Sequence, residues 1–94
     1  MSELASVRAI AYGRVQGVFF RDFTSRQAKE LGLVGYVRNL PGSDAVEVHA
    51  EGEKEELGKL LDWLDTGSPA SRVDRVESFW SEYTGGYSEF NIRY

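Results

Sequence analysis

The sequence contains no cysteine and only one histidine, His49. Without cysteine the fold can use neither disulfides nor a thiolate metal site, so we expect its core to stabilise itself. No apolar stretch approaches the roughly 20 residues that cross a bilayer, and residues 1–6 lack the basic start and apolar run of a secretory signal. These absences favour a cytoplasmic globular protein that contacts no membrane.

The length and composition fit one small domain. The 94 residues suffice for a single core. Leu, Ile, Val and Phe make up about a quarter of them, which is more than a disordered chain would have. We expect residues 1–6 to form a flexible N-terminal segment and residues 7–94 to form the domain.

The net charge of −4 is unevenly distributed along the chain. Residues 1–40 carry six basic and three acidic side chains, a net charge of +3, whereas residues 41–94 carry five basic and twelve acidic ones, a net charge of −7. An acidic chain is a poor candidate for non-specific binding to nucleic acid. The basic N-terminal part favours a small anion as the ligand.

The N-terminal half predicts a strand, a helix and a hairpin. Residues 7–12 alternate as a strand with apolar side chains on both sides, which indicates a central position in a sheet. A helical pattern over residues 22–31 ends at Gly32, which suits a stop in the left-handed conformation. Two further strands, residues 33–40 and 45–50, form a hairpin around a Pro-Gly turn.

The C-terminal half predicts a second helix and two strands. Four leucines spaced at i, i+3, i+4 and i+7 make a single apolar stripe; they are Leu57, Leu60, Leu61 and Leu64. The Gly-Ser-Pro sequence at residues 67–69 ends this helix. Residues 75–83 read as a strand, and the Thr-Gly-Gly sequence at 84–86 predicts a tight turn into a last strand over residues 88–94.

These elements follow one another as β-α-β-β-α-β with one additional C-terminal strand. That order is the ferredoxin-like arrangement, an α+β sandwich in which a mostly antiparallel sheet carries two helices on one face. Two functions known on such a fold are disfavoured. An RNA-recognition module needs aromatic residues at exposed sheet positions and a basic surface, and a copper chaperone needs a pair of cysteines.

Residues 13–21, Gly-Arg-Val-Gln-Gly-Val-Phe-Phe-Arg, form a short loop between the first strand and the first helix. We call them the phosphate loop. Such a loop presents unpaired backbone N–H groups in one direction, and Gly17 lets the backbone curve tightly and approach an oxyanion. Arg21 lies where the helix dipole already places partial positive charge, which is awkward for a cation unless an anion occupies the space between them. The pattern therefore predicts a phosphate site.

The phosphate loop resembles the signature loop of the acylphosphatases, small enzymes that hydrolyse carboxyl-phosphate anhydrides. Gly35-Tyr36-Val37-Arg38-Asn39 is similar to the second motif of that family, and the alternation of Phe90-Asn91-Ile92-Arg93-Tyr94 extends the resemblance to the C-terminus. It covers nearly the whole chain, from about residue 7 to residue 94. The resemblance implies the same fold with a five-stranded sheet.

The resemblance also implies a role for each site residue. The guanidinium of Arg21 would grip the phosphoryl oxygens, for which its planar fork of donors is suited. Asn39 would orient a water, although by itself an asparagine before Leu-Pro-Gly reads more readily as a turn-former. The remaining contacts would come from the backbone amides of five residues, which are Gln16, Gly17, Val18, Phe19 and Phe20.

The expected reaction needs few catalytic groups. An acyl phosphate leaves as a carboxylate, whose conjugate acid has a pKa near ~4, so no general acid is required. We expect no metal and no cofactor, an acyl phosphate as substrate, inorganic phosphate as product and a monomeric enzyme. His49, between two glutamates on the polar face of a strand, is expected to be a solvated surface residue rather than a base. The alternative is a non-catalytic ferredoxin-like module that binds a phosphate-containing ligand or a protein partner.

Overall fold

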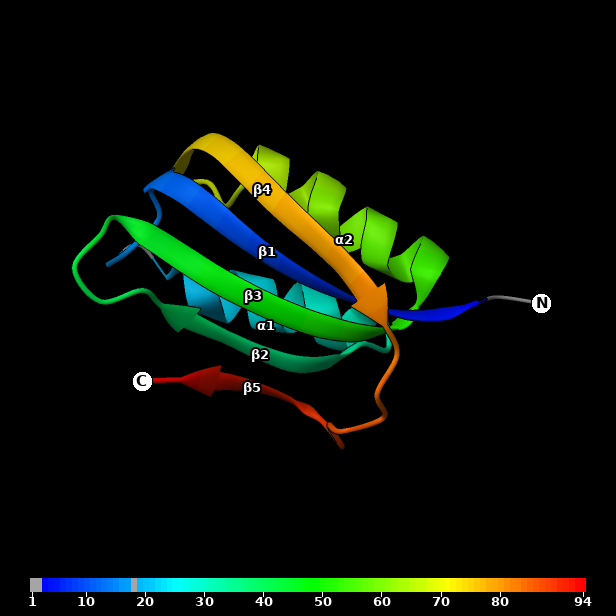
Figure 1. The fold of residues 1–94 in the computed structure, drawn as a ribbon. Coiled ribbons are helices and arrows are strands. Elements are labelled where there is room, and N and C mark those ends of the chain that lie inside the picture. Colours follow the sequence, from blue (N-terminus) through cyan, green and yellow to red (C-terminus); the bar gives the residue numbers. More distant parts are fainter. Residues whose placement is uncertain (1–2, 18) are drawn as a thin grey trace.

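The computed structural model describes residues 3–17 and 19–94 of the chain. Its elements follow in the expected order (Figure 1). They are β1 (Leu4–Arg14), α1 (Phe20–Glu30), β2 (Val34–Asn39), β3 (Ala45–Glu53), α2 (Lys54–Thr66), β4 (Arg72–Glu82) and β5 (Phe90–Arg93). Within the described residues, neither helix is long and apolar enough to cross a membrane.

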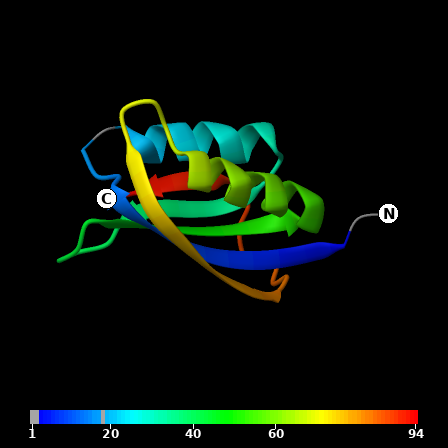
Figure 2. The same cartoon turned by 90° about the horizontal axis from the view of Figure 1, so that it is seen from above.

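The five strands form one sheet in the order β4-β1-β3-β2-β5. All neighbouring strands are antiparallel except β2 and β5, which are parallel. Both helices lie on the same face of the sheet, as the view from above shows (Figure 2). The predicted ferredoxin-like α+β sandwich with a mostly antiparallel sheet is therefore confirmed, and the one parallel pair, β2 with β5, makes the sheet mixed.

The hydrophobic core lies between the sheet and the two helices. Alternate residues of the central strands point toward the helices, among them Val7 of β1 and Val48 of β3, each 1% exposed. Helix α1 contributes Phe20, and α2 contributes the leucine stripe through Leu57 and other fully buried leucines. Helix α1 packs against β2 and β5, whereas α2 packs against β1, β3 and β4.

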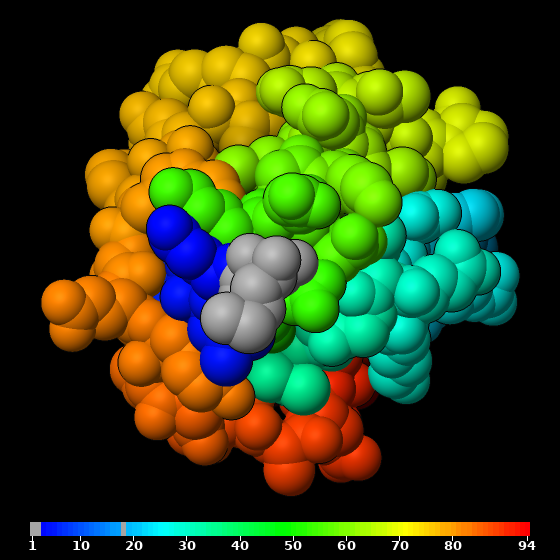
Figure 3. Space-filling view, turned by 90° about the vertical axis from the view of Figure 1, so that its right-hand side faces the viewer, coloured from blue at the N-terminus to red at the C-terminus, as the bar shows by residue number. Residues whose placement is uncertain are grey.

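Several element boundaries, and one connection between elements, differ from the sequence prediction. The first strand starts at Leu4 rather than at residue 7, because Leu4 and the two residues after it pair with the end of β3. Part of the expected flexible segment therefore belongs to the sheet. The predicted tight turn at 84–86 is wrong as well, because β4 and β5 lie at opposite edges of the sheet. Residues 83–89 instead cross one end of the molecule (Figure 3).

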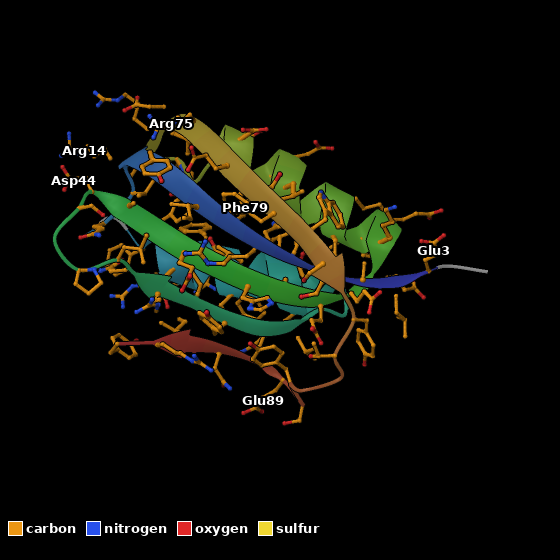
Figure 4. All side chains as sticks on the ribbon, viewed as in Figure 1. Glu3, Arg14, Asp44, Arg75, Phe79 and Glu89 are labelled. Atoms are coloured by element: carbon orange, nitrogen blue, oxygen red, sulfur yellow. The ribbon has the colours of Figure 1, made fainter. Side chains whose placement is uncertain are left out.

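On the face of the sheet away from the helices (Figure 4), two glutamates are more buried than the sequence pattern indicates. Glu47 and Glu51, which the alternation assigns to a solvated face, are only 3% and 0% exposed. Glu47 accepts hydrogen bonds from Arg8 and Arg38, and Glu51 accepts them from the β4–β5 connection. The sequence pattern correctly predicts that these glutamates point away from the helices. It wrongly predicts that they are exposed, because long side chains from neighbouring strands cover the carboxylates.

Candidate active site

Between the end of β1 and the start of α1, the phosphate loop passes through Gly17 and Phe19, which both have a positive φ. Gly17 has a φ of 72° and Phe19 a φ of 58°, both in the left-handed region. A side chain at Gly17 would meet nothing within 4 Å, so the backbone conformation and not crowding is what favours glycine there. Val18, an expected contributor, lies outside the described residues. The two left-handed residues give the loop its curvature.

The backbone amides at the start of α1 have no hydrogen-bond partner among the described residues. In the part of the chain that the structure describes, Gln16, Gly17, Phe19 and Phe20 donate no backbone hydrogen bond to another residue. Phe19 is the N-cap of α1, and no side chain caps the helix. Unpaired N–H groups at a helix N-terminus, together with the helix dipole, provide a site for an anion.

Three of these residues, Gly17, Phe19 and Phe20, border a cavity of about 290 Å³. Its charged lining residues are Arg21 and Asp22, and its apolar ones include Val15, Phe20 and Ile92. The residues that line it are Val15, Gly17, Phe19, Phe20, Arg21, Asp22, Ile92 and Tyr94. Residues 15–22 and the C-terminal strand are thus brought together although they lie some seventy positions apart in the sequence.

Arg21 is held at this cavity by the C-terminal strand. Its Nη1 donates a hydrogen bond of 3.3 Å to the backbone carbonyl of Arg93, and its guanidinium carbon lies 4.7 Å from the ring centroid of Tyr94. The side chain keeps most of its five N–H donors for a ligand, since this carbonyl uses one of them. Sequence reasoning found Arg21 but missed Ile92 and Tyr94 as cavity residues, because only the parallel pairing of β5 with β2 brings them there.

Asn39 stands at the end of β2 and does not line the cavity. The parallel register pairs Val37 with Ile92, and Asn39 projects to the same side of β2 as Val37, two positions further on. It therefore lies on the strand adjacent to the cavity residues of β5. Its Oδ1 is buried and has no hydrogen-bond partner among the described residues. A buried amide oxygen without a partner is uncommon and fits a position that a water or ligand completes.

Gln16 connects the phosphate loop to the β2–β3 hairpin. Its Nε2 lies 2.8 Å from the carbonyl of Ser43, 2.7 Å from that of Ala45 and 3.3 Å from that of Leu40. Gln16 lines a neighbouring cavity of about 380 Å³ rather than the one at Arg21. The sequence predicts a role for its backbone amide only. Arg14 and Asp44, which line the same second cavity, mark this end of the sheet (Figure 4).

His49 is not the solvated surface residue that the sequence predicts. It is half-buried in β3, its Nε2 lies 2.8 Å from the hydroxyl of Ser6, and its ring lies 5.8 Å from that of Tyr36 and 5.5 Å from that of Tyr87. The aromatic neighbours come from β2 and from the crossing connection, which the sequence pattern does not place beside it. His49 lines neither cavity, so the expectation that it is no catalytic base stays unchanged.

A metal centre has no evident ligands. Among the described residues no three side chains of His, Cys, Asp or Glu gather closely enough to hold a metal ion. The electrostatics of the cavity instead depend on the guanidinium and the helix N-terminus. This arrangement is able to bind a tetrahedral anion and stabilise added negative charge on it.

The chain matches the family model described as Acylphosphatase over residues 7–92. Among curated proteins, it is 50% identical over 88 residues to an acylphosphatase of Dehalococcoides mccartyi (strain CBDB1), covering 94% of this chain and 97% of that protein. An acylphosphatase of Anaeromyxobacter dehalogenans (strain 2CP-C) is 42% identical over 94 residues, and both chains are covered completely. The crystal structure of the acylphosphatase from Bacillus subtilis has a TM-score of 0.90 at 36% identity, covering 98% of this chain and 100% of that one.

Proposed function

Because this chain belongs to the acylphosphatase family and hydrolyses the carboxyl-phosphate bond of acyl phosphates, we propose that Arg21 and the amides of the phosphate loop hold the phosphoryl group while Asn39 orients the attacking water. The observation that carries the proposal is the set of unpaired amides at the start of α1, on the cavity that Arg21 also lines. The amides assigned are those of Gln16, Gly17, Val18, Phe19 and Phe20.

Charge stabilisation is the main task of such a site. The phosphoryl group carries its charge on oxygens, and fixed N–H donors aimed at them need no reorganisation as the charge shifts during the reaction. Arg21 adds a full positive charge and directional donors. Its hydrogen bond to the Arg93 carbonyl fixes the orientation of the guanidinium before substrate arrives. Binding and stabilisation of the transition state then use the same groups.

The water is assigned to Asn39. Its unpaired, buried Oδ1 would accept a hydrogen bond from the water and leave a lone pair of the water oxygen directed at phosphorus. As the new P–O bond forms, the bond between phosphorus and the acyl oxygen breaks and the carboxylate leaves with the electron pair. The proton of the water passes to a phosphate oxygen, so neither a general base nor a general acid on the protein is needed.

We predict that Arg21→Ala and Asn39→Ala each lower kcat for acetyl phosphate by about 10²–10³-fold, the range for one well-placed donor to a developing charge. Steady-state hydrolysis is measured in the presence of a chelator, so that metal-dependent contaminants do not contribute. Arg26→Ala is the matched control, because Arg26 is an exposed arginine of the same helix that stacks on Phe23 and does not line the cavity.

Near-native turnover by either variant would show that its residue has no such role. Thermal unfolding of each variant accompanies the kinetics, so that loss of folded protein is separated from loss of chemistry. Binding of inorganic phosphate to the unaltered protein without any turnover would favour the non-catalytic module.

We also propose that the enzyme works as a monomer in the cytoplasm, without nucleic acid or membrane partners. In support, the described cavity is formed by residues of one chain, and the sequence has a net charge of −4 and no cysteine. Sedimentation velocity at micromolar protein concentration tests the oligomeric state. A stable dimer under these conditions would contradict the proposal.

A further inference from the structure

The side chain of Gln16 joins the phosphate loop to the β2–β3 hairpin. Its Nε2 donates hydrogen bonds to the carbonyls of Ala45 at 2.7 Å and Ser43 at 2.8 Å, and a longer one to that of Leu40 at 3.3 Å. The hairpin lies at the same end of the sheet as the phosphate loop (Figure 1). The function proposed above uses the backbone N–H group of Gln16 and gives its half-buried side chain no task.

The carbonyl of Ala45 connects this contact to Asn39. It also accepts a 3.0 Å hydrogen bond from the amide of Leu40, the residue that follows Asn39. The neighbouring pair of the ladder is Asn39 with Val46. Gln16 therefore holds the hairpin one residue beyond the end of β2, where the buried Oδ1 of Asn39 has no hydrogen-bond partner among the described residues. A shift of the Ala45 carbonyl would carry the end of β2 with it.

A backbone hydrogen bond also joins the two segments. The amide of Gly13 donates to the carbonyl of Asp44 at 3.3 Å, next to the pairing of Tyr12 with Ala45. This bond holds the hairpin against the end of β1 and needs no side chain. Gln16 makes its contact three residues further along the phosphate loop. Its side chain can therefore be changed while the backbone contact between β1 and the hairpin stays.

We propose that Gln16 is a positioning residue for the hydrolysis, because its side chain sets the distance between the phosphoryl group on the loop amides and the water at Asn39. Attack on phosphorus needs both partners in one geometry, and a displacement of about 1 Å lowers the rate by as much as about 10²-fold. The curvature of the loop depends also on Gly17 and Phe19, so binding of phosphate is less sensitive to this side chain. The inference rests on the role proposed for Asn39.

The first test separates turnover from phosphate binding in Gln16→Met. Methionine has a similar length and no N–H donor, and the backbone amide is kept. We expect kcat for acetyl phosphate to fall about 10- to 100-fold, while the dissociation constant of inorganic phosphate, measured by calorimetry, changes less than about 3-fold. Unchanged kcat would overturn the inference. So would equal losses in kcat and in phosphate affinity, because the side chain would then only support the loop.

Gln27→Met is the matched control. Gln27 is the other glutamine of the chain, is half-buried in α1 and lines neither cavity. Its replacement should leave both kcat and phosphate affinity unchanged. Gln16→Asn is a second variant that keeps a polar amide but is one methylene too short to reach the same carbonyls, and it should show the same split as Gln16→Met. Thermal unfolding of each variant confirms that the measured protein is folded.

A double-mutant cycle identifies the residue through which Gln16 acts. In protein that carries Asn39→Ala the water is already misplaced, so adding Gln16→Met should lower kcat further by less than about 3-fold. In protein that carries Arg26→Ala, the control of the previous subsection, Gln16→Met should cause its full loss. Additive losses in the Asn39 cycle would overturn the inference. Failure of the proposed function would appear separately, as near-native turnover by Asn39→Ala alone, and would remove the basis of this inference as well.

Discussion

Glu47 combines near-complete burial with a full set of charged partners. Its carboxylate accepts 2.6 Å hydrogen bonds from Nε of Arg8 and of Arg38, and a 3.1 Å hydrogen bond from the hydroxyl of Tyr36. Burial raises the pKa of Glu47, but the hydrogen bonds from these three side chains outweigh burial, so the pKa lies below its ordinary value. The ionised form is therefore part of the native structure.

We predict that Glu47→Gln lowers the free energy of unfolding at pH 7 by about 2 kcal/mol, the scale of a lost hydrogen bond to a charged group. The arginines are about 40% exposed and keep part of their hydration, which limits the loss. Urea unfolding measures it, with Glu77→Gln on the same face as control. Glu77 accepts one hydrogen bond from Tyr12 and is 43% exposed, so its replacement should cost less than about 1 kcal/mol. Equal losses in the two variants would contradict this account.

The sequence pattern could not predict how deeply the side chains on this face are buried. Alternation along β3 correctly assigns Glu47 and His49 to the face away from the helices. It does not say whether that face is covered, because the covering side chains come from other strands. Arg8 and Arg38 lie 39 and 9 positions from Glu47 in the sequence, and Tyr87 lies 38 positions from His49.

The most consequential connection between elements is the crossing from β4 to β5 (Figure 3). It is fastened by Glu51, which is fully buried and accepts hydrogen bonds from the hydroxyl of Thr84 at 2.8 Å, the amide of Thr84 at 3.1 Å and the amide of Gly85 at 3.0 Å. The crossing leads directly to β5, which carries Ile92 to the cavity. The position of the cavity wall thus depends on a carboxylate at the far end of β3.

We predict that Thr84→Val lowers the free energy of unfolding by about 1.5–3 kcal/mol, because the carboxylate of Glu51 loses a charge-assisted hydrogen bond. Thr84→Ser, which keeps the hydroxyl, should lose much less. Hydrogen exchange of the amides of β5 should accelerate in Thr84→Val more than exchange in β1. Uniform acceleration across the sheet would show that Thr84 does not act on β5 in particular.

Most of the helices and strands can be predicted from the sequence, but the crossing from β4 to β5 cannot. The leucine stripe and the turn signals between β2 and β3 are local patterns, and the predicted second helix and hairpin are confirmed. The placement of β5 is not local. Its partner β2 lies more than fifty positions away, with Phe90 opposite Gly35, and no turn signal encodes that pairing. The Thr-Gly-Gly sequence at residues 84–86 is typical of a hairpin turn, and for that reason the local pattern predicts the wrong connection.

At the scale of the whole molecule, two buried carboxylates link folding to pH. Burial raises the pKa of Glu51, but hydrogen bonds from Thr84 and Gly85 outweigh it, so its pKa, like that of Glu47, is lowered. A carboxyl group with a lowered pKa in the folded state binds protons more readily when unfolded. Its contribution is complete above the unfolded pKa, about 4.3, and is lost as the pH falls through the folded value.

We predict that the free energy of unfolding is nearly constant from about pH 5.5 to 8 and decreases below about pH 4. Urea unfolding at a series of pH values measures this. Glu47→Gln and Glu51→Gln should each show a smaller decrease toward acid than the unaltered protein, because each lacks one of the titrating groups. A variant with the full decrease would show that its carboxylate does not contribute.

The architecture and the catalytic assignment have different sources in the sequence. Periodicity was enough for the order of elements and for two helices on one face of a sheet. The assigned roles of Arg21 and Asn39 came from motifs and remain proposals about chemistry. The sequence predicts only the part of the cavity that the phosphate loop forms, because Ile92 and Tyr94 come from the opposite end of the chain.

The side chain of Gln16 has a consequence for protein engineering. Its bonds to the hairpin carbonyls make the signature nonapeptide dependent on a loop that follows it by more than twenty positions. If the nine residues alone were grafted onto another scaffold, they would lack the hydrogen bonds to the hairpin that hold the loop in its curved conformation. A transplant would need both segments, spaced as they are here.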